Sequence, residues 1–372
     1  MDNSEIKLPV YSKLAQILLG IIAFFYILYI GQDIIVPITF STIIAILLNP
    51  IVNYLTSKKF NRVIAIFIAL FTAIILIVVL SFIIASRLSA FTDSFPQLKL
   101  HFISTFNNFL IWVSDTLHIS VEKTDEWIAK MKTEGFNSST SVITQTIGTL
   151  SGILVVIFLL PVYIFMILFY KSHLLEFISQ LFEREKHKVV AEVLVETRSL
   201  IQSYLIGLSL EAFIVASLNS IGLLILGVQS AILIGIIGAL LNIIPYIGGL
   251  VAIAIPMLMA FATQSPIVAF WVLIAYLIVQ FIDNNFIVPR IVASRVKING
   301  LISIVVVLFG GALWGIPGMF LSIPLTAIAK VVFDRIEPLK PFGFLLGDVQ
   351  SDKGGTIFHF KIPLKRKKPV NK

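Results

Sequence analysis

The feature that most constrains this chain is a run of 71 residues, from Ala212 to Ile282, that contains no Asp, Glu, Lys or Arg. A second charge-free run of 32 residues extends from Ile298 to Ala329. Charged residues make up about 25% of an ordinary soluble domain, but only 13% of this chain. Because a soluble fold of this size needs more polar surface, the chain is expected to be an integral membrane protein.

The overall composition excludes several other classes of protein. Hydrophobic residues make up 58% of the chain, and the mean hydropathy is +1.00. The net charge of +8 is distributed between the apolar runs, so it does not indicate a nucleic-acid partner. The absence of Cys excludes disulfides, thiolate metal sites and Cys nucleophiles.

No pattern typical of a cofactor site, a metal site or an enzyme is present. The five histidines lie outside the apolar runs and share no close spacing. The chain has no P-loop, no HExxH motif and no G-x-S-x-G motif. The sequence therefore predicts a protein that is not an enzyme and that holds no metal ion and no cofactor.

Six apolar segments are each long enough to cross about 30 Å of hydrocarbon as one helix. They are residues 14–30, 34–56, 63–86, 148–170, 204–228 and 266–288. The first segment is expected to stay in the protein, because no cleavage site of small residues follows it.

Two further apolar segments, residues 230–262 and 298–329, are too long for one crossing, since the first would measure about 50 Å as a single helix. Glycine and proline interrupt both segments near the middle, at Asn242, Pro245, Gly248 and Gly249 in the first and at Gly310, Gly311, Gly315, Pro317 and Gly318 in the second. We therefore expect an all-α membrane protein with six full spans and two re-entrant helical hairpins. Each hairpin follows a span, and the two units form an inverted repeat.

The positive charges of the short loops indicate the orientation. Lys58, Lys59 and Arg62 place the loop after the second span in the cytoplasm, and hence the N-terminus too. Arg290 and its basic neighbours also lie in the cytoplasm if residues 230–262 return to the side that they entered from. The protein is thus expected in the inner (cytoplasmic) membrane, with both termini in the cytoplasm.

These patterns divide the chain into six parts. They are three spans in 1–86, an amphipathic extramembrane segment in 87–147, the fourth span in 148–170, a cytoplasmic amphipathic helix in 171–203, the core transport region in 204–333, and a basic cytoplasmic tail in 334–372. The two amphipathic segments either pack as small caps or dock another molecule.

Broken helices indicate a solute path, because unpaired peptide groups are tolerated in a membrane only where they are buried in protein or line a polar cavity. The alternative is that glycine and proline only permit tight helix packing. The residues predicted to form the path are Asn242, Pro245, Gly248, Gly249, Gly311 and Pro317, with Asp283 and Asn284 in contact with a solute or cation.

Glu211 and Asp283 are the acids of the apolar half and are the candidate coupling groups. Asp283, followed by two Asn residues, offers oxygen ligands for a hard cation or an acceptor for a proton. Two structural interpretations remain open. Asp283 could pair with Lys or Arg near its helix end, and Glu211 could be an interfacial carboxylate.

Three motifs resemble the bacterial autoinducer-2 exporter family. They are NIIPYIGGLVAIAIP (242–256), QFIDNNFIVPRIVASRVKINGL (280–301) and LFGGALWGIPGMFLSIPLTAIAKVVFD (308–334). The resemblance implies a homo-oligomeric permease that moves small polar solutes outward, and some relatives are described as sodium or lithium/proton antiporters. Where this family usually has Arg-Gly-Gln, the chain has Ile206, Gly207 and Leu208.

The expected function is therefore secondary transport of a small polar solute out of the cell. A solute like autoinducer-2 is one candidate. Two alternatives remain: a sodium (lithium)/proton antiporter, and a non-transporting membrane scaffold. The expected partners are a small-molecule or cation substrate, membrane lipid and further copies of the chain, but no nucleic acid.

Overall fold

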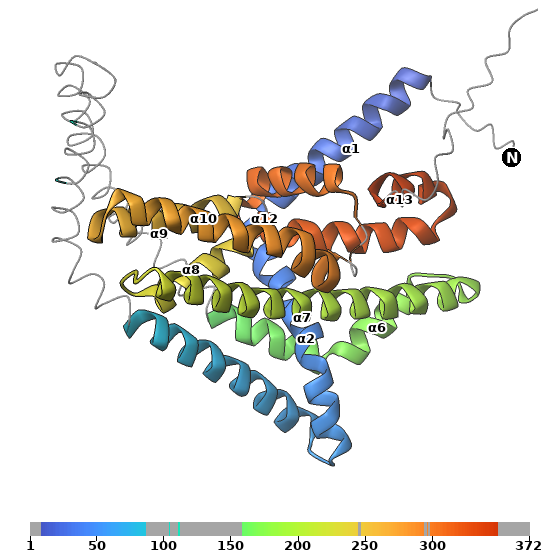
Figure 1. Ribbon diagram of the computed structural model, residues 1–372. Helices are drawn as coiled ribbons and strands as arrows, with labels where there is room; N and C mark the ends of the chain where they lie inside the picture. The colour runs from blue at the N-terminus through green and yellow to red at the C-terminus, as the bar shows by residue number, and fades with distance from the viewer. Residues whose placement is uncertain are drawn as a thin grey trace, which may run out of the picture.

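The computed structural model describes residues 9–86, 104, 111, 158–244, 247–293, 296 and 298–348 (Figure 1). Apart from two isolated positions, the predicted extramembrane segment 87–147 lies outside the described residues, as does the first part of the predicted span 148–170. The basic end of the tail, from residue 349 onward, also lies outside them.

Helices make up almost all of this described part, in which no β-strand occurs. Their bounds are α1 (Val10–Ile30), α2 (Gln32–Ser57), a helix at Arg62–Ser86, a helix at Phe158–Phe169, α6 (Lys171–Gln180), η2 (Arg184–Lys186), α7 (His187–Ile225), α8 (Ala231–Asn242), α9 (Ile247–Thr263), α10 (Pro266–Ile282), the π-helix η3 (Asp283–Ala293), α12 (Gly300–Arg335), η4 (Glu337–Leu339) and α13 (Lys340–Leu346).

Six of the described helices are long and apolar enough to cross a membrane, which confirms the prediction of an all-α, multi-pass membrane protein. They cover Tyr11–Ile30, Gln32–Ser57, Arg62–Ser86, Arg184–Ile225, Pro266–Val292 and Gly300–Arg335. The helices Ala231–Asn242 and Gly248–Phe261 are apolar but shorter.

The first predicted break separates α8 from α9, and these two helices form an antiparallel hairpin. A Cβ added to Gly248 would collide with the carbonyl oxygen of Leu241, and one added to Gly238 would lie 3.7 Å from the Cβ of Ala252. Residues that precede the break therefore lie beside residues that follow it, in reverse order. How deeply this hairpin enters the membrane stays a prediction.

The second predicted break folds α12 back on itself, as its two arms in Figure 1 illustrate. Gly315 has φ 62° and ψ −144°, a conformation essentially restricted to glycine. A Cβ on Gly310, before the turn, would lie 2.5 Å from the carbonyl oxygen of Gly318 and would collide with Ser322 Oγ. The two arms of α12 are thus in backbone contact. A side chain at position 310 would prevent this contact.

α7 and the continuous pair α10–η3 run antiparallel. A Cβ on Gly222 would lie 3.8 Å from Ala275 Cβ, and one on Gly207 would lie 2.7 Å from the carbonyl oxygen of Ile291. Each of these long helices is followed by a helical hairpin, so the two helix-plus-hairpin units start in opposite directions. This is the arrangement that an inverted repeat requires.

The described residues form four clusters of buried apolar side chains, of which the three larger ones hold most of these elements together. One joins α7, α8, α9 and α10 around Leu223 and Val272. A second joins α2, α7, η3 and α12 around Ile201 and Leu321. The third joins α2 to the Arg62–Ser86 and Phe158–Phe169 helices around Ile66. Between the first two clusters lie the polar residues that the next subsection describes.

The contact between the arms of α12 predicts the effect of a small substitution. Gly310→Ala is expected to reduce the free energy of unfolding by about 1–3 kcal/mol, because the added methyl group must displace Ser322 or the Gly318 backbone. Gly300→Ala is the matched control, since a Cβ there would meet nothing within 4 Å. Thermal unfolding of the detergent-purified variants measures the difference, and equal stability of the two variants would contradict the hairpin packing.

Candidate functional site

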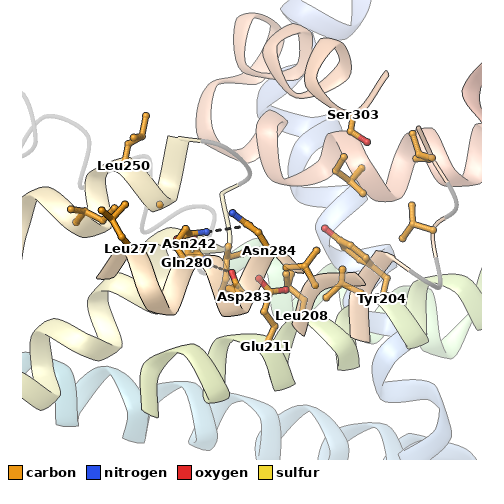
Figure 2. A pocket seen from close by; sticks show the side chains of 18 residues that line it. Tyr204, Leu208, Glu211, Asn242, Leu250, Leu277, Gln280, Asp283, Asn284 and Ser303 are labelled. Atoms are coloured by element: carbon orange, nitrogen blue, oxygen red, sulfur yellow. Dashed lines mark hydrogen bonds between the residues drawn. The ribbon is translucent and has the colours of Figure 1, made fainter. Parts of the chain in front are cut away.

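A cavity of about 650 Å³ lies where α7, the α8–α9 hairpin, α10, η3 and both arms of α12 approach one another (Figure 2). Its apolar walls come from side chains such as Leu208, Ile253 and Val292. Its polar lining residues are Tyr204, Glu211, Asn242, Gln280, Asp283, Asn284 and Ser303. Among the described residues that line it, none is Lys, Arg or His.

Two carboxyl groups approach this cavity from facing elements. Glu211 is on α7 and is 6% exposed, and Asp283 is the first residue of η3 and is 1% exposed. Figure 2 shows their side chains directed toward each other. Because buried carboxylates lose hydration and repel each other, this pair requires compensation by polar groups, a proton, a cation or a bound solute.

The α8–α9 hairpin supplies part of that compensation. Asn242, at the end of α8, donates a hydrogen bond of 2.8 Å from Nδ2 to Asp283 Oδ2. The other carboxylate oxygen, Oδ1, is buried and has no hydrogen-bond partner in the described part of the chain. A buried acceptor without a partner is costly and in native proteins usually marks a site for water, an ion or a ligand.

Gly249 allows two amide side chains to approach the start of α9. A Cβ at this position would lie 3.1 Å from Gln280 Oε1 and 3.2 Å from Asn242 Oδ1. Gln280 in turn donates a hydrogen bond of 3.3 Å from Nε2 to Asn284 Oδ1. One part of the cavity wall is therefore a band of amide groups that extends from the hairpin to the α10–η3 junction.

The π-helical geometry of η3 begins at Asp283. Pro289 has no amide hydrogen and cannot make the usual bond to the carbonyl four residues earlier. Close to this point, the side chain of Asn285 donates to the carbonyl oxygen of Phe281, at 2.8 Å. Irregular helical turns of this kind are frequent at functional sites, because they reorient side chains and release backbone groups.

Buried polar groups continue beyond the cavity along the seam between α7 and α10. Asn219 and Tyr276 are each 4% exposed, and Asn219 Oδ1 and Tyr276 Oη have no hydrogen-bond partner among the residues described. A Cβ on Gly238 would lie 3.0 Å from Tyr276 Oη and 3.6 Å from Asn219 Nδ2. Asn219 lies about two turns beyond Glu211, so the polar character of α7 extends past the cavity.

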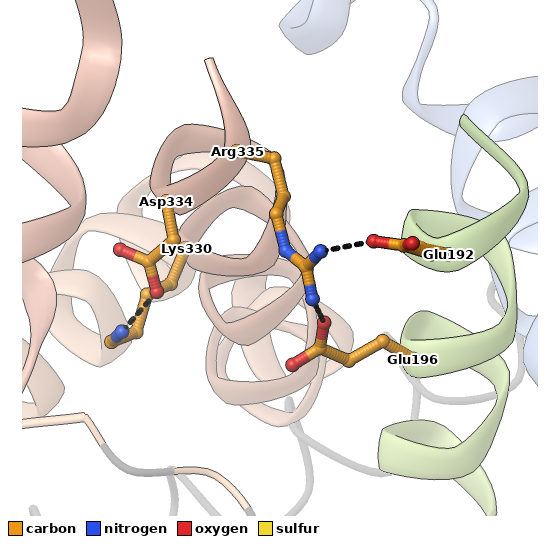
Figure 3. A network of polar contacts seen from close by, with 5 residues as sticks. All are labelled: Glu192, Glu196, Lys330, Asp334 and Arg335. Atoms are coloured by element: carbon orange, nitrogen blue, oxygen red, sulfur yellow. Dashed lines mark hydrogen bonds and ion pairs between the residues drawn. The ribbon is translucent and has the colours of Figure 1, made fainter. Parts of the chain in front are cut away.

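A second cavity of about 880 Å³ adjoins the first, because Val296 lines both. Arg335 at the end of α12 donates to Glu192 at 2.5 Å and to Glu196 at 2.9 Å, both on the N-terminal part of α7 (Figure 3). Lys330 and Asp334 form an ion pair of 2.5 Å beside them. The ion pairs of Arg335 thus connect the second arm of α12 to α7 at this end of the molecule.

The structure brings together five of the predicted residues, Glu211, Asn242, Gly249, Asp283 and Asn284, around the first cavity. The other four lie elsewhere or are not described. Gly248 packs against Leu241 in the hairpin turn, Gly311 faces Met319 of the other α12 arm, Pro317 is exposed on α12, and Pro245 lies outside the described residues.

Sequence reasoning missed Tyr204 and Ser303 as lining residues. Tyr204 lies seven residues before Glu211, so helical periodicity places both on one face of α7 and could have identified it. Ser303 reaches the cavity only because the first arm of α12 packs beside it, and the sequence has no local signal for that packing. The hydrogen bond that the structure records for Asp283 comes from Asn242, rather than from the Lys or Arg considered above.

A polar cavity between broken helices in a multi-pass helical membrane protein is typical of membrane transport proteins. Family comparison agrees with this class, since residues 18–337 match the model of the AI-2E family transporters. The chain belongs to this family, whose members are transport proteins rather than enzymes.

Individual relatives are similar over most of their length. The AI-2 transport protein TqsA of Escherichia coli is 24% identical over 323 residues, which are 87% of this chain and 92% of that protein. A Haemophilus influenzae protein named "Putative transport protein" is 28% identical over 351 residues, 92% of this chain and 99% of its own length. The transport class therefore carries over to this chain, with a small-molecule substrate and a lipid environment.

The bond between Asn242 and Asp283 predicts the effect of removing its donor. Asn242→Val is expected to lower the free energy of unfolding by about 1–3 kcal/mol, because Asp283 then has two buried oxygens without a donor. Asn53→Val, at an exposed position of α2, is the control and is expected to change the free energy of unfolding by about 0.5 kcal/mol or less. Thermal unfolding compares the two variants, and an equal effect would argue against an organised site.

Proposed function

We propose that this protein is a secondary transporter that exports a small polar solute, and that the solute binds in the cavity between α7 and η3. The observation that carries the proposal is the buried polar lining around Asp283, where one carboxylate oxygen has no partner among the described residues. A solute with hydroxyl groups would supply the missing donors.

The lining favours a neutral, hydroxylated solute over an anion. Its polar groups are two carboxyl groups, amides and hydroxyls, and the described lining includes no cationic side chain. A volume of about 650 Å³ is in the range of small-molecule sites. An autoinducer-2-like furanone fits this chemistry, and the relative TqsA is named as an AI-2 transport protein.

The bond from Asn242 to Asp283 offers a way to couple binding to movement. It connects the turn of the α8–α9 hairpin to the first residue of η3, and these elements belong to opposite helix-plus-hairpin units. A solute that donates to Oδ1 of Asp283 shares the carboxylate with Asn242, which donates to Oδ2, so binding changes the attachment of the hairpin. Alternating access then follows if one unit moves against the other around the cavity.

A second candidate function is sodium or lithium/proton antiport. The observation that favours it is the pair of buried acids, Glu211 and Asp283, in a cavity whose described lining has no Lys, Arg or His. Carboxylate and amide oxygens are suitable ligands for a hard cation, and carboxylates also accept protons.

We also propose that the protein lies in the inner membrane. In the proposed orientation, the N-terminal part of α7, α13 and both termini are in the cytoplasm. The two hairpins then enter the membrane from opposite sides, and several copies assemble around one another.

In intact cells, an impermeant thiol reagent is expected to label a cysteine at Gln264 but not one at Lys340. Labelling of both positions would contradict this topology.

Flux through vesicles that contain the purified protein tests the transport proposal. Asp283→Asn is expected to reduce efflux of a hydroxylated furanone by about tenfold or more, because the solute loses a charged acceptor. Asp33→Asn, at an exposed acid near the start of α2, is the matched control and is expected to leave flux unchanged.

The same experiment separates the two candidate functions. If Asp283→Asn abolishes sodium- or pH-dependent flux and leaves furanone efflux intact, Asp283 serves cation transport, which favours the antiporter and contradicts solute binding at Asp283. If vesicles with the unmodified protein move neither furanone nor cations, both transport proposals fail for these solutes.

A further inference from the structure

A third cavity lies beside the N-terminal part of α7, next to a bend in the chain. The Phe158–Phe169 helix and α6 meet at an angle of 64°. The cavity, of about 300 Å³, is bounded by α2, these two helices and α7. Its walls are mainly apolar, and they include Ile46, Ile167, Leu175 and Leu194. It shares no lining residue with the cavity around Asp283.

Positive charges gather at the rim of this cavity. Lys171, the first residue of α6, and Arg198 on α7 both line it. The charges of Arg198 and Arg62 are near enough to act on the Lys171 ammonium group. Lys171 therefore lies close to two further cations, at the point where an apolar helix bends into an amphipathic one.

Two of these cations are held in place by neutral partners. Lys171 Nζ donates to Asn49 Oδ1 at 3.1 Å, and Asn49 is 5% exposed. Arg62 donates to the carbonyl oxygen of Leu168 at 2.7 Å and to Ser172 Oγ at 3.3 Å. None of the ion pairs found among the described residues involves Lys171, Arg198 or Arg62. The cluster is thus positioned, but no described carboxylate neutralises it.

The surroundings identify the kind of anion that would complete the cluster. α6 carries exposed Leu174, Leu175 and Phe177, and the turn after it carries exposed Leu181 and Phe182. Such a helix lies along a membrane surface, with its apolar side chains among the lipid. A helix in that position would hold the cations near the lipid headgroups, next to the apolar cavity.

We propose that Lys171 and Arg198 bind the phosphate of an anionic phospholipid, and that one of its acyl chains occupies the apolar cavity beneath. Basic pockets between membrane helices recognise anionic headgroups through the same charge-assisted hydrogen bonds. The lipid would connect α2 and α6 to the N-terminal half of α7. Since α7 also carries Glu211, bound lipid stabilises the helix that forms one wall of the transport cavity.

Lipid-dependent thermal unfolding of the full-length protein in detergent tests this site. Added phosphatidylglycerol is expected to raise the melting temperature, because a ligand that binds only the folded state stabilises it. In the double variant Lys171→Gln/Arg198→Gln, the apparent dissociation constant for this lipid is expected to increase on the order of tenfold. Phosphatidylcholine, which has no net charge, is expected to give little stabilisation to either protein.

Two controls distinguish a specific site from general attraction to charge. The double variant Arg184→Gln/Lys340→Gln removes the same charge from exposed positions away from the cavity and is expected to keep normal affinity. Leu175→Ser leaves the cations in place and is expected to lower the affinity for phosphatidylglycerol, because less apolar surface is in contact with the acyl chain.

Three results would overturn the proposal. An equal loss of affinity in both double variants would indicate only a diffuse surface charge. Equal stabilisation by inorganic phosphate and by phosphatidylglycerol would show that the acyl chain contributes nothing. Equal stabilisation by phosphatidylcholine would show that the cations do not select the headgroup.

Discussion

The burial of the Asp283 carboxylate is the constraint on which the arrangement of the site depends. A carboxylate that is 1% exposed, in an apolar part of the chain, needs donors from its surroundings. One donor is Asn242, which belongs to a hairpin 41 residues earlier in the chain. The hairpin turn, the start of η3 and the facing part of α7 must therefore meet at one point. The remaining oxygen, without a partner in the described chain, is what makes this meeting point a candidate binding site.

Close backbone contacts make this meeting possible. Gly207 of α7 lets η3 approach, and Gly249 leaves room for the amide groups of Asn242 and Gln280. Gly207 lies between Ile206 and Leu208 and is the residue of this segment that contacts the backbone of Ile291. The helices of the core thus approach one another through small residues, as is common in membrane proteins.

Much of the fold could be predicted from the sequence, because the signals are local. Charge-free runs predict membrane helices, and the glycines and prolines at 242–249 and 310–318 predict the positions where α8–α9 and α12 turn. The amphipathic segment from 171 onward is less simple than the pattern indicates. α6 ends at Gln180, and α7 then continues from His187 across residue 204 into the apolar core.

The partners within the site could be predicted only in part. Burial of acids in an apolar run identifies Glu211 and Asp283, but no local signal pairs Asp283 with Asn242 or brings Ser303 to the cavity. A glycine or proline in the sequence indicates where the chain turns. It does not indicate whether that residue will line the cavity. For this reason Gly311 and Pro317, which were expected along the path, lie in α12 away from the lining of the first cavity.

Water access to the cavity at Asp283 is the most direct test of the central claim, and the absence of natural cysteines makes it straightforward. Single cysteines would replace Asn284, which lines the cavity, and Ile278, which is 54% exposed on α10 outside the cavity lining. A small hydrophilic thiol reagent is expected to react with the first cysteine and not with the second, and a bound solute should slow the first reaction. If the cysteine at 284 is as unreactive as the one at 278, the cavity is not a water-accessible path and the account is wrong.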